Sequence, residues 1–212
     1  MQIPVIRGKE ELRPLYERVP GYYLGGYVRW MCSPRRKPAP PADVDIYAHD
    51  EIVFEELKQR IDREIRSEND VCITYKLKDS DLHPPIQLIK PQIKGALVTA
   101  GSMAEIIENF DFTICRIGLI SLDEAECDPD FLDDEAMRHL VPKNIHCPIS
   151  STLRAMKYSR KGYYLTTSSC MALLDDWLLR SDSYRDKIRD LLAIKEPTKE
   201  EIEELEFLMR FD

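Results

Sequence analysis

Two acidic residues separated by one position give the clearest chemical signal in this chain. Asp43 and Asp45 alternate with the apolar Val44 and Ile46. Residues i and i+2 of a β-strand point to the same face, so both carboxylates would project together while the apolar pair faces a core. Like charges this close raise each other's pKa unless a cation lies between them, and Mg²⁺ binds carboxylate and phosphate oxygens. The pattern predicts a divalent-metal site, and the simpler alternative is the solvated face of an edge strand.

A glycine pair, Gly25-Gly26, precedes the acidic pair by fewer than 20 residues. The stretch 24–29 is typical of a strand that ends in a glycine turn and opens a helix. Such a turn lets backbone N–H groups approach a phosphate at the positive end of the helix. Taken alone, a glycine pair is more often an ordinary turn than a phosphate-binding turn. A phosphate-binding turn and a metal site close together in the sequence indicate nucleotidyl transfer.

A third carboxylate, Asp111, lies between two phenylalanines at the start of a predicted strand. If this strand neighbours that of the acidic pair, three carboxylates meet and hold two metal ions roughly 3.5–4 Å apart. These ions, Mg²⁺ or alternatively Mn²⁺, would activate the attacking 3′-hydroxyl and stabilise the leaving pyrophosphate. The alternative is that Asp111 caps the strand or pairs with Arg116, while Gln87 on the preceding strand lacks the charge to replace it. We therefore predict three catalytic and metal-binding residues: Asp43, Asp45 and Asp111.

Composition limits the class of protein and its partners. The 212 residues are 43% apolar and 32% charged, as in a globular protein long enough to bury a core. The net charge of −8 argues against a long nucleic-acid track, since phosphate contacts require a basic excess, and favours a nucleotide or a strand tip. No apolar run approaches the roughly 18 residues that span a membrane. The six scattered cysteines and the absence of a signal-peptide pattern favour the reducing cytoplasm, without membrane insertion.

Apolar periodicity divides the chain into an α/β front and a helical rear. The front is predicted to contain helices over 9–19, 27–32, 50–66 and 102–109, and strands over 21–24, 43–48, 71–77, 86–89 and 110–120. The acidic stretch 123–135 is expected to be a solvated surface excursion. The rear is predicted to contain helices over 150–160, 167–180, 183–194 and 198–210. The predicted fold class is α/β (α+β), with a small mixed sheet flanked by helices over 1–148 and an all-α part over 149–212.

Four motifs make residues 20–165 resemble the head domain of the poly(A) polymerase and CCA-adding tRNA nucleotidyltransferase group, within the DNA polymerase beta superfamily. In chain order they are Gly25-Gly26-Tyr27-Val28-Arg29, the Asp43–Asp45 strand, Asp111-Phe112-Thr113-Ile114 and the helix over 153–163. The chain departs from the family pattern at Trp30, where an acid is expected, and at Asn109-Phe110, where two basic residues are expected. In scale the chain resembles the compact bacterial toxin and antiphage-defence nucleotidyltransferases.

This resemblance implies roles for residues on both sides of the predicted cleft. Gly25 and Gly26 would hold the triphosphate of an NTP or dNTP, with Arg29 close to it. Two basic residues of the helix that follows the head would reach the nucleotide, and a tyrosine would stack on its base: Arg154, Lys157 and Tyr158. Positions 154, 157, 158 and 161 share one helical face, and the alternative there is an exposed basic face.

We expect a template-independent nucleotidyltransferase that moves NMP or dNMP to a hydroxyl and releases pyrophosphate. The favoured acceptor is a nucleotide or a short nucleic-acid 3′ end, with oligonucleotide synthesis in antiphage defence as one setting. Alternatives are toxin-type transfer to tRNA or to a protein hydroxyl and, outside enzymes, a degenerate nucleotide-binding regulatory module. An antitoxin or effector protein is a candidate partner, and the stretch 200–207 either docks on such a partner or closes the helical part.

Overall fold

A mixed β-sheet forms the centre of the molecule. The computed structural model describes residues 1–38, 41–77, 83–94, 97–194 and 198. Within these ranges one sheet contains, from edge to edge, β1 (Gln2–Pro4), β10 (Glu124–Cys127), β9 (Ile117–Leu119), β2 (Tyr22–Leu24), β3 (Val44–Tyr47), β6 (Ile86–Ile89), β5 (Cys72–Tyr75) and β4 (Ile65–Glu68). Neighbouring strands are antiparallel except β3 and β6, which run parallel. The predicted mixed sheet is confirmed.

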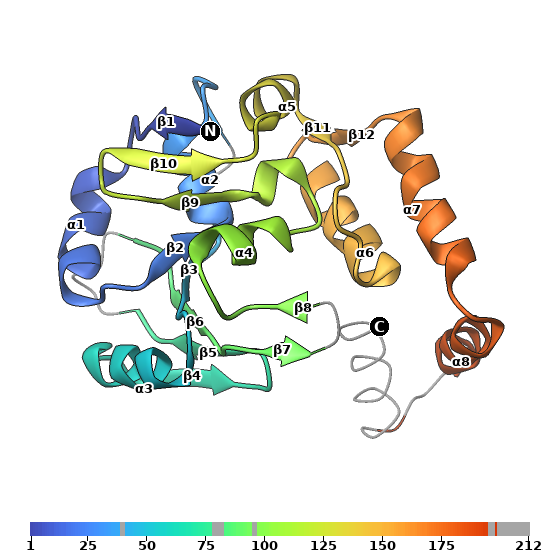
Figure 1. Cartoon of the computed structure of the whole chain (residues 1–212), viewed down its shortest axis with the longest axis horizontal. Helices are drawn as coiled ribbons and strands as arrows, with labels where there is room; N and C mark the ends of the chain where they lie inside the picture. The colour runs from blue at the N-terminus through green and yellow to red at the C-terminus, as the bar shows by residue number, and fades with distance from the viewer. Residues whose placement is uncertain (39–40, 78–82, 95–96, 195–197, 199–212) are drawn as a thin grey trace.

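Helices flank this sheet and continue beyond it (Figure 1). In chain order they are α1 (Lys9–Arg18), α2 (Gly26–Cys32), α3 (Glu51–Arg60), α4 (Met103–Glu108), α5 (Phe131–Met137), α6 (Pro148–Ser159), α7 (Thr167–Leu179) and α8 (Asp182–Ala193). Two further strand pairs are β7 (Ile93–Lys94) with β8 (Leu97–Val98) and β11 (His139–Leu140) with β12 (Tyr164–Leu165). The N-termini of two helices follow their sequence signals. Asp50 caps α3 by accepting from the Val53 amide, and Ser102 and Glu105 form the predicted capping box of α4.

Alternation along β3 decides which face of the sheet carries the acidic pair. Val44 and Ile46 are buried in the main core, which also contains residues of α1, α2 and α3. Asp45 and Tyr47 are half-buried and point to the opposite face, where Tyr47 packs beside the α4 cluster. The period of two expected from the sequence is therefore confirmed, and it places a carboxylate on the face that α4 shares.

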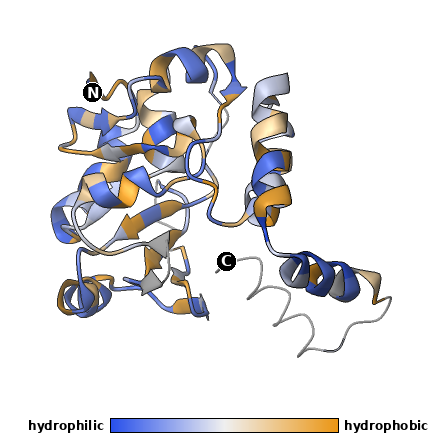
Figure 2. Ribbon diagram, turned by 45° about the vertical axis from the view of Figure 1, so that its right-hand side comes forward, coloured by the Kyte–Doolittle hydropathy of each residue, from blue (hydrophilic) through white to orange (hydrophobic). Residues whose placement is uncertain are grey.

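Helix α6 is joined to the front of the chain by its own hydrophobic cluster. The cluster unites the segment after Asp111 with α6 and the turn that follows it: Phe112, Ile114, Cys115, Leu140, Ala155, Tyr158 and Tyr163. Helices α7 and α8 lie farther from the sheet, at the side of the molecule opposite α1 and α3 (Figure 1). Colouring by hydropathy shows apolar positions along α7 (Figure 2), and its Leu174 and Leu178 are exposed. Within the described ranges, every helix is too short or too polar to cross a bilayer.

The predicted helix over 50–66 is wrong in its last turn and a half. Helix α3 ends at Arg60, and residues 65–68 form the edge strand β4 instead. Ile61 and Ile65 continue the helical spacing in the sequence, but Ile65 pairs with Tyr75 of β5. Strand pairing, a tertiary interaction, overrides the local periodicity here. The predicted helix over 198–210 lies outside the described residues except for residue 198.

The predicted strand over 110–120 is also wrong in its first half. Residues Thr113–Cys115 form a 3₁₀ turn, and strand β9 begins only at Ile117. Phe112 makes an isolated bridge to Pro142, so this segment leaves the sheet toward α6. Strand β9 pairs with β2 and β10, which separates it from β3 by one strand. Strand β9 is therefore not paired with β3, although Phe110 beside Asp111 packs against Tyr47 of β3.

The acidic stretch 123–135 is only in part the solvated excursion that its charge suggests: Asp123, Glu124, Asp130 and Asp133 are exposed, whereas other acids are buried. Strand β10 lies between β1 and β9, and α5 buries Asp134 and Glu135. Glu135 is fully buried. Its carboxylate accepts hydrogen bonds from Ser33 and Tyr163, which offset the cost of removing the charge from water. Buried carboxylates are found where such partners are present.

Candidate functional site

One cavity brings together most of the predicted site residues. Its volume is about 280 Å³, and it lies between the glycine turn, the start of β3 and one face of α6. The predicted residues that line it are Gly25, Gly26, Arg29, Asp43, Asp45, Arg154, Lys157 and Tyr158. Asp111 is the predicted residue missing from this wall. Segments more than a hundred residues apart in the sequence thus form one site.

The acidic pair sits at the start of β3. Asp45 is the second residue of the strand, Asp43 immediately precedes it, and both are half-buried. Burial, and next the charge of Asp43, raise the pKa of Asp45 to about 7, although Lys157 and Arg154 oppose the shift. The two ionised carboxylates therefore repel each other. A cation between them would relieve that repulsion.

The glycine turn lies directly against this pair. Gly25 has φ 72° and ψ −132°, a conformation open to glycine but not to residues with a Cβ. Its N–H donates to the Ile117 carbonyl at 2.9 Å, which anchors the turn on β9. A Cβ on Gly25 would lie 3.8 Å from Oδ2 of Asp45, whereas one on Gly26 would have no atom within 4 Å. Because the first amides of α2 lack helical acceptors, they are available to an anion beside the carboxylates.

Helix α6 and the residues after it supply the positive charge of the cavity. Arg154 and Lys157 are exposed on the helix, and Lys161 follows its C-terminal end. Burial and the nearby positive charges of Arg29 and Lys157 lower the pKa of Lys161. Positive charges that lie this close repel one another, and a bound anion would relieve that repulsion. Residues 154, 157, 158 and 161 all line the cavity, with Lys161 placed just beyond the end of α6.

Asp111 occupies a different place from the one predicted. Its carboxylate is buried, accepts from Ser151 Oγ at 3.0 Å and forms an ion pair with Arg154 Nη1 at 2.8 Å. It lines an adjoining cavity rather than that of Asp43 and Asp45. Among the described residues no three His, Cys, Asp or Glu side chains are close enough to share a metal ion. Arg116, which the alternative interpretation paired with Asp111, pairs with Asp128 at 3.0 Å.

Arg29 is held in a buried network at the back of the cavity. Its side chain is 1% exposed, with Nη1 3.5 Å from Glu135 Oε2 and hydrogen-bonded to the Tyr163 hydroxyl. Its guanidinium also lies over the rings of Tyr158 and Tyr163. These contacts position Arg29 as a support of the cavity wall, with its charge compensated from within the protein.

Tyr158 is buried against the same network. The ring is 8% exposed and packs against Phe112 and Tyr163, and its hydroxyl lies 3.1 Å from the Cys115 sulfur. This packing leaves the ring little surface on which a base could stack. The helical spacing in the sequence located Tyr158 on the correct face but did not reveal how deeply it is buried.

The cavity wall also contains residues outside the predicted site set, among them Gln87, Tyr47 and Phe110. Gln87 of β6 is the register partner of Asp45, and the aromatic rings of Tyr47 and Phe110 lie 5.9 Å apart across the wall. Tyr47 follows Asp45 by two positions, so strand alternation alone places it on the acidic face. Gln87 was considered from the sequence only as a residue that cannot replace a carboxylate, and Phe110 has no comparable signal because it reaches the cavity through the tertiary fold.

The donor set of the acidic pair fits a divalent ion such as Mg²⁺. Mg²⁺ is commonly held by one or two carboxylates together with phosphate oxygens of a substrate. Asp43 and Asp45 provide two carboxylates, burial and the charge of Asp43 raise the pKa of Asp45, and the glycine turn lies alongside. A second ion of a two-metal site would have fewer protein ligands than the predicted three-carboxylate site provides. The reason is that Asp111 forms an ion pair with Arg154.

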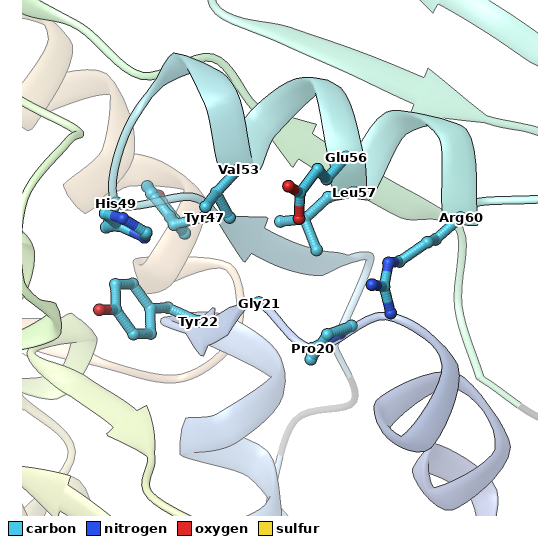
Figure 3. A pocket seen from close by; sticks show the side chains of 9 residues that line it. All are labelled: Pro20, Gly21, Tyr22, Tyr47, His49, Val53, Glu56, Leu57 and Arg60. Atoms are coloured by element: carbon cyan, nitrogen blue, oxygen red, sulfur yellow. The ribbon is translucent and has the colours of Figure 1, made fainter.

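A separate cavity lies at the opposite end of β2 and β3. Its volume is about 290 Å³, and Figure 3 shows its lining from the two strands and α3. The lining combines the polar side chains of His49, Glu56 and Arg60 with the apolar side chains of Val53 and Leu57. It shares Tyr47 with the acidic cavity but contains neither carboxylate of the pair.

Comparisons with known proteins give structural matches. Neither protein-family models nor curated proteins match this sequence. A tRNA-processing enzyme in an apo form matches 97% of this chain and 58% of its own, with 18% identity and a TM-score of 0.55. The Bacillus stearothermophilus CCA-adding enzyme in complex with CTP matches 85% of this chain and 48% of its own, with 16% identity and a TM-score of 0.55.

A tRNA nucleotidyltransferase complexed with a primer tRNA and an incoming ATP analog matches 93% of this chain and 60% of its own, with 20% identity and a TM-score of 0.50. The chain thus spans roughly half of each of these structures. At such identities the comparison establishes the arrangement of the backbone. The chain has the nucleotidyltransferase fold found in solved CCA-adding enzymes.

Proposed function

We propose that this protein is a template-independent, metal-dependent nucleotidyltransferase. It transfers NMP or dNMP from a nucleoside triphosphate to a hydroxyl and releases pyrophosphate. The observation that carries the proposal is the single cavity in which Asp43 and Asp45 meet the Gly25-Gly26 turn and the cations of α6. Carboxylates for a metal, amides for a phosphate and cations for a triphosphate are the groups that this reaction requires.

Each group of the cavity has a role in this reaction. The acceptor oxygen bonds to the α-phosphorus, the bond from that phosphorus to the pyrophosphate oxygen breaks, and the hydroxyl proton is released. Gly25 and Gly26 allow the triphosphate to approach the first amides of α2, while Lys157 and Lys161 offset its charge. Asp43 and Asp45 would hold Mg²⁺, which when bound would supply Lewis-acid stabilisation of the developing charge. Most of the catalysis is positioning and electrostatic stabilisation.

The acceptor we propose is the 3′ hydroxyl of a nucleotide or of a short nucleic acid. The chain has a net charge of −8, which disfavours contacts along many phosphates. The likeness in fold to a tRNA nucleotidyltransferase that was solved with a primer tRNA makes a tRNA 3′ end the first acceptor to test. Transfer to a protein hydroxyl, as in a toxin, is tested in the same assay. Free cysteines throughout the fold suit a reducing compartment such as the cytoplasm.

The test is a product screen with the purified protein. Wild type is incubated with Mg²⁺, each labelled NTP and dNTP, and either short oligonucleotides, tRNA or a protein mixture, and products are resolved by mass. Extended oligonucleotides or tRNA support the proposal and identify the acceptor class. The matched variant Asp45→Asn keeps the shape of the side chain, loses its charge and is expected to form no product. Equal product from wild type and Asp45→Asn would overturn the metal assignment.

A second candidate function follows from the position of Gln87. Because Gln87 stands beside Asp45 and Asp111 is paired with Arg154, the cavity has two acids rather than three. That arrangement suits a nucleotide-binding regulatory module that binds NTP without turnover and acts through a partner protein such as an antitoxin or an effector. Stoichiometric NTP binding with no product in any arm of the screen would favour this function over the enzyme.

A further inference from the structure

The cavity at the opposite end of β2 and β3 from the acidic pair has no role in the proposed reaction. Its walls come from the segment that enters β2, from the end of β3 and from one face of α3 (Figure 3). We call it the α3 cavity. Its volume of about 290 Å³ approaches the roughly 300 Å³ of the smallest typical ligand pockets. The α3 cavity is therefore large enough for a small organic molecule.

One face of α3 supplies both charge and apolar surface to this cavity. Positions 53, 56, 57 and 60 have the i, i+3, i+4, i+7 spacing of a single helical face, and all four line the cavity. Leu57 is buried and Val53 is half-buried, whereas Glu56 and Arg60 are exposed. Figure 3 shows the carboxylate of Glu56 and the guanidinium of Arg60 directed from the helix toward the opposite wall. This face presents an acid, a cation and apolar side chains to the same space.

The two charges of this face do not pair with each other. An acid and a cation four positions apart on a helix commonly form an ion pair, with the acid on the N-terminal side. Glu55 and Lys58 of the same helix form such a pair at 3.6 Å. Within the described part of the chain, however, Glu56 and Arg60 have no ion pair with each other or with another residue. An uncompensated acid and an uncompensated cation therefore face one cavity.

The opposite wall adds aromatic surface. Tyr22 of β2 and Tyr47 of β3 are register partners, and both are half-buried. At this end of the cavity His49 pairs with Asp50 at 2.8 Å, so its ring already has a partner. A few polar groups set in apolar walls are typical of sites for small organic ligands. Here a purely anionic ligand would meet the charge of Glu56, and a purely cationic ligand would be repelled by the guanidinium across the wall.

We propose that the α3 cavity binds a small zwitterion with an apolar side chain, the chemical class of a free α-amino acid such as leucine or phenylalanine. The guanidinium of Arg60 binds the carboxylate of the ligand, and the carboxylate of Glu56 binds its ammonium group. The side chain of the ligand packs against Val53, Leu57 and Tyr22. Because both charged residues are exposed, we expect a dissociation constant of about 1 mM. This binding site is separate from nucleotidyl transfer and does not rest on it.

The test is a titration of isotope-labelled protein, followed through the NMR chemical shifts of its backbone amides. The probes are L-phenylalanine, L-leucine, phenylpropionate, which lacks the ammonium group, phenethylamine, which lacks the carboxylate, and glycine, which lacks the side chain. L-phenylalanine and L-leucine should shift amides of α3 saturably, and the three truncated probes should bind at least about fivefold more weakly. No nucleotide is present, so the result is independent of the proposed function.

Two exposed substitutions assign each charge of the cavity to one group of the ligand. Arg60→Gln should weaken L-phenylalanine about fivefold and should bind phenethylamine no more weakly than wild type does. Glu56→Gln should weaken L-phenylalanine by a similar factor and should bind phenylpropionate no more weakly. Arg60→Lys, which keeps the charge, should retain most of the affinity. Glu55→Gln and Lys58→Gln are the matched controls, since both residues belong to α3 but lie outside the cavity lining, and they should bind as wild type does.

Other outcomes overturn the proposal. Absence of saturable shifts with L-phenylalanine and L-leucine up to about 10 mM would show that the cavity does not bind this class of ligand. Equal affinity for L-phenylalanine and for phenylpropionate or phenethylamine would remove the zwitterion assignment. Losses in the control variants equal to that in Arg60→Gln, or shifts confined to residues of the acidic cavity, would place the binding elsewhere.

Discussion

Asp45 of β3 and Gln87 of β6 are register partners on the sheet's parallel strand pair, and both line the acidic cavity. An uncharged amide therefore stands where a third carboxylate would be nearest to the acidic pair. This relationship limits how strongly the protein alone can hold divalent ions. A substitution at position 87 is therefore the most direct way to change the affinity of the protein for divalent ions.

Gln87→Glu should strengthen divalent-ion binding. The added carboxylate increases the negative charge beside Asp45, so we expect the Mg²⁺ dissociation constant to fall about tenfold or more. Without Mg²⁺ the same charge should lower the free energy of unfolding, because three carboxylates repel one another. Calorimetric Mg²⁺ titration and urea unfolding measure these effects. The exposed control Gln59→Glu should change neither quantity. Unchanged Mg²⁺ affinity in Gln87→Glu would contradict a metal site at the pair.

The raised pKa of Asp45 predicts that stability falls as pH rises. Burial and Asp43 raise this pKa from its usual 3.8 to about 7, so between these values the folded state holds a proton that the unfolded chain has released. The free energy of unfolding should therefore decrease with rising pH across this window and remain lower above it. Asp45→Asn removes the effect and should be more stable than wild type near pH 8, by up to about 4 kcal/mol.

Urea unfolding near pH 5 and near pH 8, without divalent ions, checks this sign. Wild type should lose more stability than Asp45→Asn between the two conditions. Exposed Glu124→Gln serves as the control and should follow wild type. Parallel pH profiles for wild type and Asp45→Asn would show that Asp45 carries no such shift.

Asp111→Asn should distinguish a positioning residue from a metal ligand. Its carboxylate contacts Arg154 and Ser151, so the variant should release the Arg154 side chain and raise the KM for NTP several-fold. Affinity for Mg²⁺ should stay near that of wild type, whereas Asp43→Asn should weaken it at least tenfold. A loss of Mg²⁺ affinity in Asp111→Asn equal to that in Asp43→Asn would restore Asp111 to the metal site and require a rearrangement of the Arg154 pair.

Gly25→Ala and Gly26→Ala should differ in stability although the two residues are adjacent. Gly25 has φ 72°, and an alanine forced into this conformation costs about 1–3 kcal/mol. Gly26 is helical and a Cβ there meets no atom within 4 Å, so its alanine should be neutral or slightly stabilising. Thermal and urea unfolding of the two variants compare these effects. Equal losses would show that the turn does not require the observed backbone.

Glu135→Gln should destabilise the protein strongly. The substitution leaves the buried Arg29 without a compensating charge, and breaking one partner of a buried pair costs about 3–5 kcal/mol. The network also includes Arg35, Ser33 and Tyr163, which lose a charged acceptor. Urea unfolding checks the loss, with Asp133→Asn on the same helix as the control. A change below about 1 kcal/mol would show that Glu135 does not anchor this region.

The sequence determined the parts of this site that depend on local backbone geometry. Alternation of Asp43-Val44-Asp45-Ile46 was sufficient to place one carboxylate on an open face of β3, because strand side chains alternate regardless of the neighbouring strands. The Gly25-Gly26 turn and the capping box at Ser102 were likewise readable, since each involves residues within one helical turn.

Tertiary structure decided which charges meet. Asp111 pairs with Arg154 across 43 positions of sequence, and Arg29 meets Glu135 in the core, because the order of strands brings those segments together. The Phe110–Asp111–Phe112 pattern suggested a strand, but Phe112 packs onto α6 and turns the chain out of the sheet. A charge is stabilised by whichever opposite charge lies nearest in space, and one-dimensional spacing does not encode that distance.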